Sequence, residues 1–209
     1  LGFQGINGKG ETIKSGGTVV KNVTGYDLSK LITGSFGTLL VLSEITLKVL
    51  PIQTDTKTII ISGLSLEHST ALMNSAISSA NDPSGTVYYP GNLRNNFVFN
   101  DLTHQGSITA IRVEGTKVST EQRINNFFED LALSDQKTTI LDKTQSEIFW
   151  EDTRSLKVFS RNEKSILRVV VPSSETVNLM NRLKTFHPSY FLDWGGSLIW
   201  LELDYISNQ

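Results

Sequence analysis

Apolar residues in the first fifty positions are spaced as in β-strands. Residues 1–6 and 11–14 flank Asn7-Gly8, and this dipeptide predicts a hairpin because both of its residues tolerate positive φ. Residues 18–20 form a short β-branched run that predicts another strand. Residues 39–49 begin as a continuous apolar run and then alternate. That pattern predicts a strand buried on both faces at one end and on one face at the other.

A short helix is expected between these strands. Asp27 is placed to cap it, and Leu28, Leu31 and Ile32 share one of its faces. Gly34 follows where a left-handed residue commonly ends a helix. The helix is therefore less than two turns long, and a glycine-rich loop connects it to the next strand.

A polar, proline-marked segment at residues 51–56 is the expected boundary between two domains, residues 1–52 and 53–209. Beyond it, segments with helical spacing separate segments with strand spacing. Helices are expected over 66–80, 120–133 and 176–186. Strands are expected over 58–62, 86–89, 96–100, 108–114, 138–141, 166–171, 190–194 and 198–203.

This order of elements predicts an α+β fold. The first domain is β-rich with a short helix, and the second is ferredoxin-like, with an antiparallel sheet and helices on one face. A capping-box spacing at residues 144–147 precedes Ile148, Phe149 and Trp150. The two helical units suggest distant copies of one plan, although their sequences are too different to establish a repeat.

Composition and charge exclude several classes of function. The 209 residues carry a formal net charge of -2 and no cysteine, which argues against nucleic-acid partners, disulfides and thiolate metal sites. No apolar run reaches the roughly 18 to 20 residues of a membrane-spanning helix. Without cysteine the chain fits a reducing compartment, so we expect it in the cytoplasm.

The most informative stretch contains glycines at 25, 34 and 37 among small polar residues. Glycine allows conformations and close approaches that a side chain forbids, so backbone amides there could reach a phosphate, a ring nitrogen or a carbonyl. Asn22 and Thr24 add hydrogen-bond donors. Tyr26 offers a flat face with a polar tip, which suits the edge of an aromatic cofactor.

Residues 21–31 (KNVTGYDLSKL) and 34–44 (GSFGTLLVLSE) resemble two signatures of the FAD-linked oxidases, the family of vanillyl-alcohol oxidase, D-lactate dehydrogenase and glycolate oxidase. Weaker similarity continues at residues 112–115, 150–154 and 193–200. The resemblance implies flavin contacts from a set of residues in this stretch: Lys21, Asn22, Thr24, Gly25, Tyr26, Gly34, Gly37, Thr38, Leu40 and Val41. Leu40 departs from the pattern, because the family usually has glycine there.

The resemblance also implies an architecture. Residues 1–52 would be the C-terminal part of an FAD-binding domain of the PCMH type, and residues 53–209 a cap that holds the substrate. The family grips the FAD pyrophosphate in an upstream lobe, so we expect FAD to bind only together with that lobe. By itself the chain should be inactive.

Implied partners are a catalytic flavoprotein subunit and an iron-sulfur subunit of a glycolate oxidase-like complex, which would bring the chain peripherally to the inner membrane. The implied substrate is a small 2-hydroxy acid, which requires a cationic anchor for its carboxylate. Arg112 and Arg154 are the candidates, although Arg112 and Glu114 are also spaced for a surface ion pair on one strand face. No catalytic residue can be assigned.

Other candidate chemistry is weak. His68, His104 and His187 lie far apart and form no metal-binding pair, so no metal site is expected. We interpret Trp194, before Gly195-Gly196, as a packed turn aromatic. Two functions therefore remain open: a component of an FAD-dependent oxidoreductase for 2-hydroxy acids, or a flavin-free interaction module that keeps a remnant of the FAD lobe.

Overall fold

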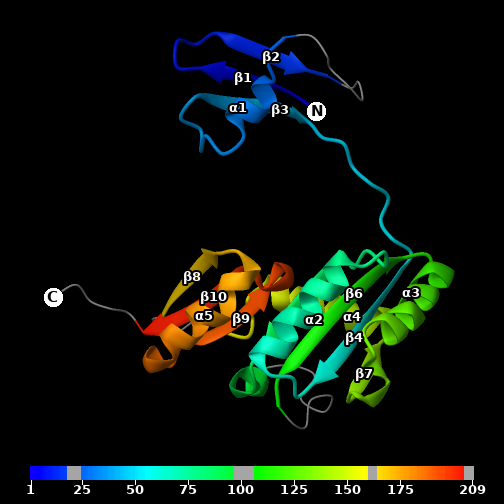
Figure 1. Ribbon diagram of the computed structural model, residues 1–209. Coiled ribbons are helices and arrows are strands. Elements are labelled where there is room, and N and C mark those ends of the chain that lie inside the picture. The colour runs from blue at the N-terminus through cyan, green and yellow to red at the C-terminus, as the bar shows by residue number, and fades with distance from the viewer. Residues whose placement is uncertain (18–24, 97–105, 160–163, 205–209) are drawn as a thin grey trace. The chain divides into compact units, whose positions relative to one another are not determined.

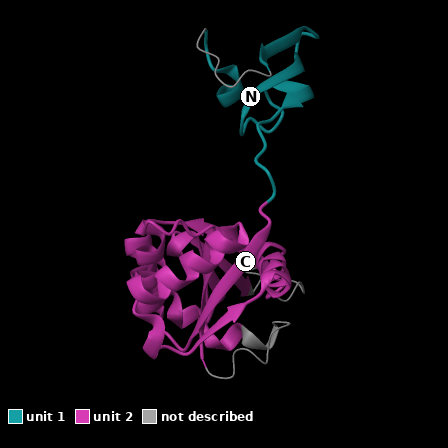
Figure 2. Ribbon diagram, turned by 90° about the vertical axis from the view of Figure 1, so that its right-hand side faces the viewer, with its two compact units in different colours: residues 1–52 teal, residues 53–209 magenta. Residues whose placement is uncertain are grey.

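The computed structural model describes residues 1–17, 25–96, 106–159 and 164–204. It divides into two compact units, Leu1–Ile52 and Gln53–Gln209 (Figure 2). The division lies within the polar, proline-marked segment.

In its described residues the first unit is a three-stranded antiparallel sheet with one short helix (Figure 1). Its strands, in the order β2-β1-β3, are β1 (Gly2–Asn7), β2 (Thr12–Gly16) and β3 (Leu40–Thr46), and its helix is α1 (Leu28–Ile32). The predicted strand at 18–20 lies outside the described residues.

The hairpin between β1 and β2 forms as predicted, but its turn is longer than the Asn-Gly pattern suggests. Positive φ falls on Gly10, at 80°, and not on Asn7 or Gly8. The Asn7 carboxamide oxygen accepts the backbone N–H groups of Lys9, at 2.9 Å, and Glu11, at 3.0 Å. These bonds close a wider loop, because asparagine can take the place of a backbone acceptor in a turn.

Burial in the first unit differs from the expectation for residues 39–49. Within β3 only Leu40 is buried, whereas Val41, Leu42 and Ile45 are exposed. Phe3 of β1 is the other large apolar side chain buried among the described residues of this unit. The apolar run was read correctly as a strand, but three strands and a five-residue helix are too few to cover both of its faces.

Within the described ranges, the second unit is a seven-stranded antiparallel sheet in the order β7-β4-β6-β5-β9-β10-β8. The strands are β4 (Asp55–Ser62), β5 (Gly85–Tyr89), β6 (Ile108–Gly115), β7 (Thr138–Leu141), β8 (Lys164–Val170), β9 (Ser189–Asp193) and β10 (Leu198–Asp204). Its longer helices are α2 (Leu66–Ser78), α3 (Lys117–Asp130), α4 (Lys143–Arg154) and α5 (Ser173–Leu183). The predicted strand at 96–100 falls almost wholly outside the described residues.

The strand order shows that one plan is used twice. Strands β4 to β7 with α2 and α3 form one ferredoxin-like half of the sheet, in which the third strand, β6, lies between the first, β4, and the second, β5. Strands β8 to β10 with α5 repeat the first three strands of that order from the opposite edge of the sheet. These two halves of the sheet meet where the second strand of each, β5 and β9, pair antiparallel.

Helices cover the sheet unequally on its two faces. Ile59 and Ile61 of β4 pack in one cluster with α3 residues such as Phe127, whereas Ile60 between them packs with Phe149 of α4. Because successive strand residues point to opposite faces, α4 lies on the opposite face from α3. Helices α2 and α5 share the face of α3 through a third cluster. The α+β fold with an antiparallel sheet is confirmed, and α4 is an addition to the expected single helical face.

Three core clusters stabilise this second unit, one on the α4 face and two on the opposite face. No helix in the described ranges is long and apolar enough to cross a membrane.

Candidate functional site

The glycine segment of the first unit is held in shape by α1. Asp27 caps the helix, and its carboxylate accepts the backbone N–H of Lys30 at 3.2 Å. The helix ends before Gly34, which has a φ of 83°, as the sequence predicted. Gly25 and Gly37 also have positive φ, at 86° and 78°. All three positions use a conformation that glycine adopts readily and most side chains avoid.

Space is open beside each of these glycines. A Cβ placed on Gly25, Gly34 or Gly37 would meet no described atom within 4 Å. At Gly5 of β1, by contrast, a Cβ would meet Leu40 Cδ1 at 2.5 Å. The backbone between residues 25 and 37 can therefore be approached by another group, as a cofactor-binding loop requires.

The side chains of this segment are also unusually exposed. Tyr26 is 93% and Phe36 98% exposed, and Val41 is exposed as well. Thr38 donates its hydroxyl hydrogen to the carbonyl oxygen of Ser35 at 2.7 Å, which leaves its lone pairs as acceptors. Leu40 is buried and packs over Gly5, so its side chain belongs to the core of the unit. Lys21, Asn22 and Thr24 lie outside the described residues.

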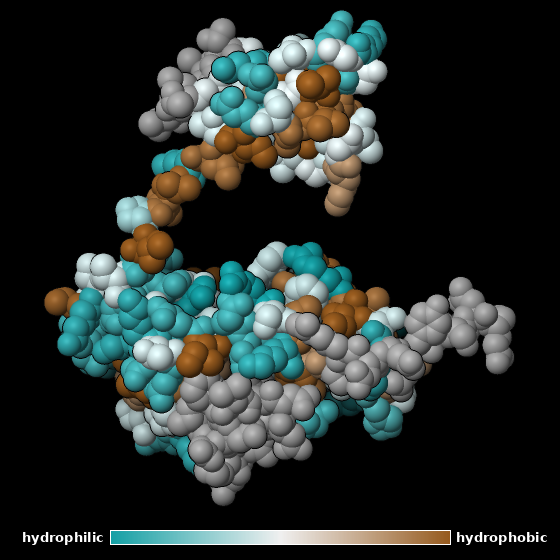
Figure 3. Space-filling model, turned by 180° about the vertical axis from the view of Figure 1, so that it is seen from behind, coloured by the Kyte–Doolittle hydropathy of each residue, from teal (hydrophilic) through white to brown (hydrophobic). Residues whose placement is uncertain are grey.

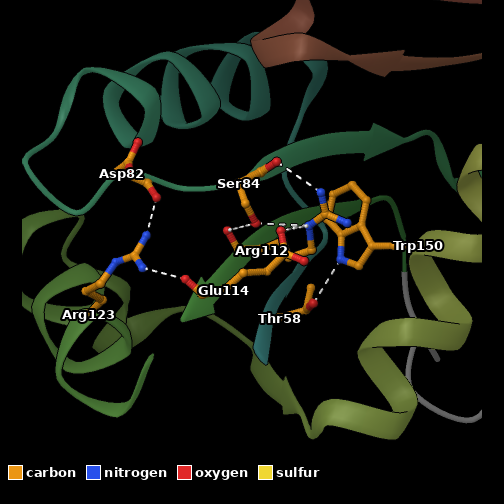
Figure 4. Close-up of polar contacts among 7 residues, drawn as sticks. All are labelled: Thr58, Asp82, Ser84, Arg112, Glu114, Arg123 and Trp150. Atoms are coloured by element: carbon orange, nitrogen blue, oxygen red, sulfur yellow. Dashed lines mark hydrogen bonds and ion pairs between the residues drawn. The ribbon is translucent and has the colours of Figure 1, made fainter. Parts of the chain in front are cut away.

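In the second unit, Arg112 lies at the centre of a polar cluster on the α4 face of the sheet (Figure 4). Its Nε donates to the hydroxyl of Ser84 at 3.0 Å, and its Nη2 donates to the carbonyl oxygen of Ser84 at 3.0 Å. The predicted ion pair with Glu114 is confirmed, at 3.3 Å. The guanidinium carbon also lies 4.7 Å from the ring centroid of Trp150.

Gly85 makes room for this arrangement. A Cβ at Gly85 would lie 3.2 Å from two ring atoms of Trp150 and 3.5 Å from Arg112 Nε. The indole N–H of Trp150 donates to the hydroxyl of Thr58 at 2.9 Å, which fixes the ring (Figure 4). Sequence reasoning did not identify Thr58, Ser84 or Gly85, because they join Arg112 and Trp150 through strand pairing and the position of α4.

Arg154 lies apart from this cluster. It is at the end of α4, its side chain is largely exposed, and it pairs with Glu151 one turn earlier on the same helix. Arg123 of α3 instead links the segment after α2 to strand β6, since it donates to the carbonyl oxygens of Asp82 and Glu114 (Figure 4).

Asp193, at the end of β9, is an ionisable group on the same sheet face that the sequence did not single out. Asp193 pairs with Val87 of β5, and Val87 pairs with Ala110 of β6. Ala110 is two residues from Arg112, so Asp193 and Arg112 lie on the same face of the sheet. Burial raises the pKa of the Asp193 carboxyl, although a hydrogen bond from the Trp194 N–H and the charges of Arg112 and Arg168 act in the opposite direction. This face thus carries two arginines around one partly buried acid.

Two further features of the described ranges bear on candidate chemistry. A hollow of about 500 Å³ lies beside α2, lined by residues that include His68, Leu72 and Asp130, and none of the predicted site residues lines it. No group of three metal-ligating side chains comes together in the described part of the chain.

Comparison with known proteins finds relatives that match a short stretch of the chain. No family model matches the sequence. The chain is 57% identical over 51 residues to glycolate oxidase subunit GlcE of Escherichia coli (strain K12), which is 24% of this chain and 15% of the relative. It is 37% identical over 60 residues to glycolate oxidase subunit GlcD of Bacillus subtilis (strain 168), which is 29% of this chain and 13% of the relative.

The fold as a whole also has solved counterparts. A crystal structure of p-cresol methylhydroxylase with substrate bound matches 98% of this chain with a TM-score of 0.67 and 8% identity. The chain covers 50% of that protein, so it corresponds to about half of a larger architecture.

In a short stretch of its sequence the chain is thus similar to glycolate oxidase subunits, GlcE among them, and to FAD-linked oxidoreductases. The likeness to p-cresol methylhydroxylase shows a shared fold.

Proposed function

We propose that this chain is part of a GlcE-like subunit of an FAD-dependent oxidoreductase that acts on a small 2-hydroxy acid such as glycolate. In this proposal the first unit supplies one edge of the flavin site as the end of an FAD-binding domain. The second unit is the cap that covers the substrate. The inference rests on the sequence similarity to the relative named GlcE, and the matched stretch covers 15% of that relative.

The open backbone between Gly25 and Gly37 is the observation that best supports flavin binding. Amides beside glycines with free space can approach a ring edge closely, and exposed Tyr26 offers an aromatic face next to them. These residues fit one edge of a flavin and would hold it together with Thr38 and Val41. When bound, the flavin would supply the electron transfer, while the protein orients it and tunes its electronics.

The buried Leu40 is compatible with this role. Its side chain packs on Gly5 and fills the inside of the unit. Leu40 pairs with Asn7 of β1 on one side, and β3 is the edge strand of the described sheet, so no described strand lies on the other side. We propose that Leu40 contributes backbone contact alone, in the place where the family usually has glycine.

Substrate anchoring is proposed for Arg112 and Arg154. Arg112 is held rigidly by Ser84, Glu114 and Trp150, as suits a positioning cation. Arg154 is exposed and pairs with Glu151. The proposed partners are a catalytic flavoprotein subunit and an iron-sulfur subunit, in a cytoplasmic complex peripheral to the inner membrane.

Flavin absorbance provides a direct test. The chain and a version extended upstream are purified with FAD, and their visible spectra are recorded. We expect the extended protein to be yellow and this chain to bind little flavin. Two colourless proteins, even with FAD added, would rule the proposal out.

Glycine variants make the test specific to the site. Gly37→Ala should weaken flavin binding by the extended protein, because a Cβ would occupy the open space beside the loop. Gly10→Ala is the matched control, since Gly10 also combines positive φ with free space but lies in the β1–β2 turn. An equal loss of flavin binding in both variants would show that backbone strain, and not a lost flavin contact, is the cause.

A flavin-free interaction module is the second candidate. The exposed apolar side chains of β3, including Val41 and Ile45, favour it. Figure 3 shows apolar residues gathered on the surface of this unit, and exposed apolar patches commonly mark a protein contact. This candidate predicts that the extended protein stays colourless and still forms a complex with partner subunits.

A further inference from the structure

Trp194 is held in an exposed and strained position. Its φ is 51°, in the left-handed region that bulky residues avoid, and 56% of its surface is exposed. The turn that carries it is anchored by three other elements. The N–H of Gly195 donates to the Thr86 hydroxyl at 3.0 Å, Asn74 of α2 donates to the carbonyl oxygen of Gly195 at 3.2 Å, and Thr176 of α5 donates to the following carbonyl oxygen at 2.6 Å.

Arg168 of β8 lies against this indole. Its guanidinium carbon is 4.9 Å from the ring centroid of Trp194 and 6.0 Å from that of Trp200. Trp200 is its direct partner across the β8–β10 pair. Two indoles thus hold one planar cation, and the interpretation of Trp194 as a packed turn aromatic is replaced by this exposed stack.

The charge of Arg168 is left available to a ligand. Arg112 and Arg154 each pair with a glutamate, whereas Arg168 forms no ion pair with any residue in the described ranges. Because the guanidinium lies over the Trp194 ring and has no acidic partner within the described ranges, its N–H donors remain for a ligand. Two such donors match the two oxygens of a carboxylate.

Nearby negative charge restricts the choice of anion. Leu198 pairs with both Asp193 and Val170, and Val170 is two residues from Arg168, so Asp193 and Arg168 lie on the same sheet face. The Asp193 carboxylate accepts the Trp194 N–H at 2.7 Å. Glu202, also on this face, pairs with Lys164. These acids repel a doubly charged anion more strongly than a singly charged one.

We propose that Arg168, Trp194 and Trp200 form a binding site for a small organic monocarboxylate. The guanidinium edge takes the carboxylate, and the indoles keep the guanidinium in place and shield the ligand's apolar part from water. The site requires no flavin, so a failed flavin test leaves it standing, and its own failure leaves the proposed function untouched.

Tryptophan emission reports on this site, because the chain has three tryptophans and two of them stack on Arg168. The full chain carrying Trp150→Phe is titrated with propionate, with neutral propionamide and with inorganic phosphate. We expect saturable quenching by propionate, and none from propionamide or phosphate at matched ionic strength. Equal responses to propionate and phosphate, or none to either, would overturn the proposal.

Arginine variants identify the ligand-binding group. Arg168→Gln should weaken propionate binding about tenfold or more, because a charge-assisted bidentate contact is lost. The propionate affinity of Arg168→Lys should lie between those of the parent and Arg168→Gln, since lysine keeps the charge but not the fork of donors. Arg182→Gln, an exposed arginine on α5, is the matched control and should bind as the parent does. Unchanged binding by Arg168→Gln, with its circular dichroism intact, would assign the quenching elsewhere.

Discussion

At the scale of single residues, the α4 face of the sheet is organised by two arginine–tryptophan stacks. Trp150 lies against Arg112 and is accommodated by Gly85, while Trp194 and Trp200 lie against Arg168. The two cations differ in their partners. Arg112 is held by hydrogen bonds and an ion pair, which fix where it could meet a substrate, whereas Arg168 forms no ion pair with the described residues.

Asp193 makes a residue-level prediction about pH. Its pKa is raised in the folded protein, so its stabilising contribution is complete below the unfolded value of about 3.8 and is lost as pH rises through the folded pKa. Asp193→Asn keeps an oxygen that can accept the Trp194 N–H and removes the charge. We therefore expect the variant to be more stable than the parent at neutral pH.

Urea unfolding of parent and variant at a series of pH values measures this difference. The difference in free energy of unfolding between variant and parent should shrink steadily as pH falls towards 3.8, the pKa of the unfolded chain's Asp193. Arg112 and Arg168 face this carboxyl from β6 and β8, and both stay charged across the range. If the variant is less stable at neutral pH, attraction to these arginines outweighs the cost of burial, and the prediction is wrong.

At the scale of elements, helix α4 shows how a local signal can be displaced by two residues. The sequence predicted a capping box at residues 144–147, whereas Asp142 and Gln145 form it. Asp142 accepts the backbone N–H of Gln145 at 2.9 Å, and the Gln145 side chain accepts the N–H of Asp142 at 3.1 Å. The helix therefore starts at Lys143, directly after β7, and brings Phe149 and Trp150 onto the sheet.

Removal of this cap should have a definite cost. Asp142→Ala should lower the free energy of unfolding by about 1 kcal/mol, because an N-terminal N–H loses its acceptor and the reciprocal bond is weakened. Asp142→Asn retains an acceptor oxygen and should cost much less. Chemical denaturation measures both variants, and equal losses would show that charge and not capping is responsible.

At the scale of the whole molecule, the two units differ in how well they bury their apolar residues. The second has three core clusters. The first buries Phe3 and Leu40 among its described large apolar side chains and leaves much of β3 exposed. Small units with little buried apolar area are marginal or unfolded on their own.

The units should therefore behave differently as separate fragments. Residues 53–209 should fold and give one cooperative urea transition. Residues 1–52 should show no such transition, because their buried area does not offset the entropy of ordering the chain. Circular dichroism during denaturation tests both fragments, and a cooperative transition in residues 1–52 would contradict this view of the first unit.

Much of the fold could be predicted because it depends on local patterns. The helix predicted at 66–80 is α2 at Leu66–Ser78, and the strand predicted at 138–141 is β7 within the same limits. The cap at Asp27 and the left-handed Gly34 were also predicted from their residue types. Such features are determined by residues within a few positions of each other, so the sequence displays them directly.

Burial and the polar clusters were decided by the tertiary structure. Val41 and Ile45 look buried in sequence, but the three-stranded sheet leaves them exposed. Arg168 and Trp194 are 26 residues apart in the chain and meet because β8 and β9 flank β10. The sequence by itself determined the strands, helices and glycine loop, whereas packing and strand order decided which side chains meet, since those contacts join residues that no local pattern connects.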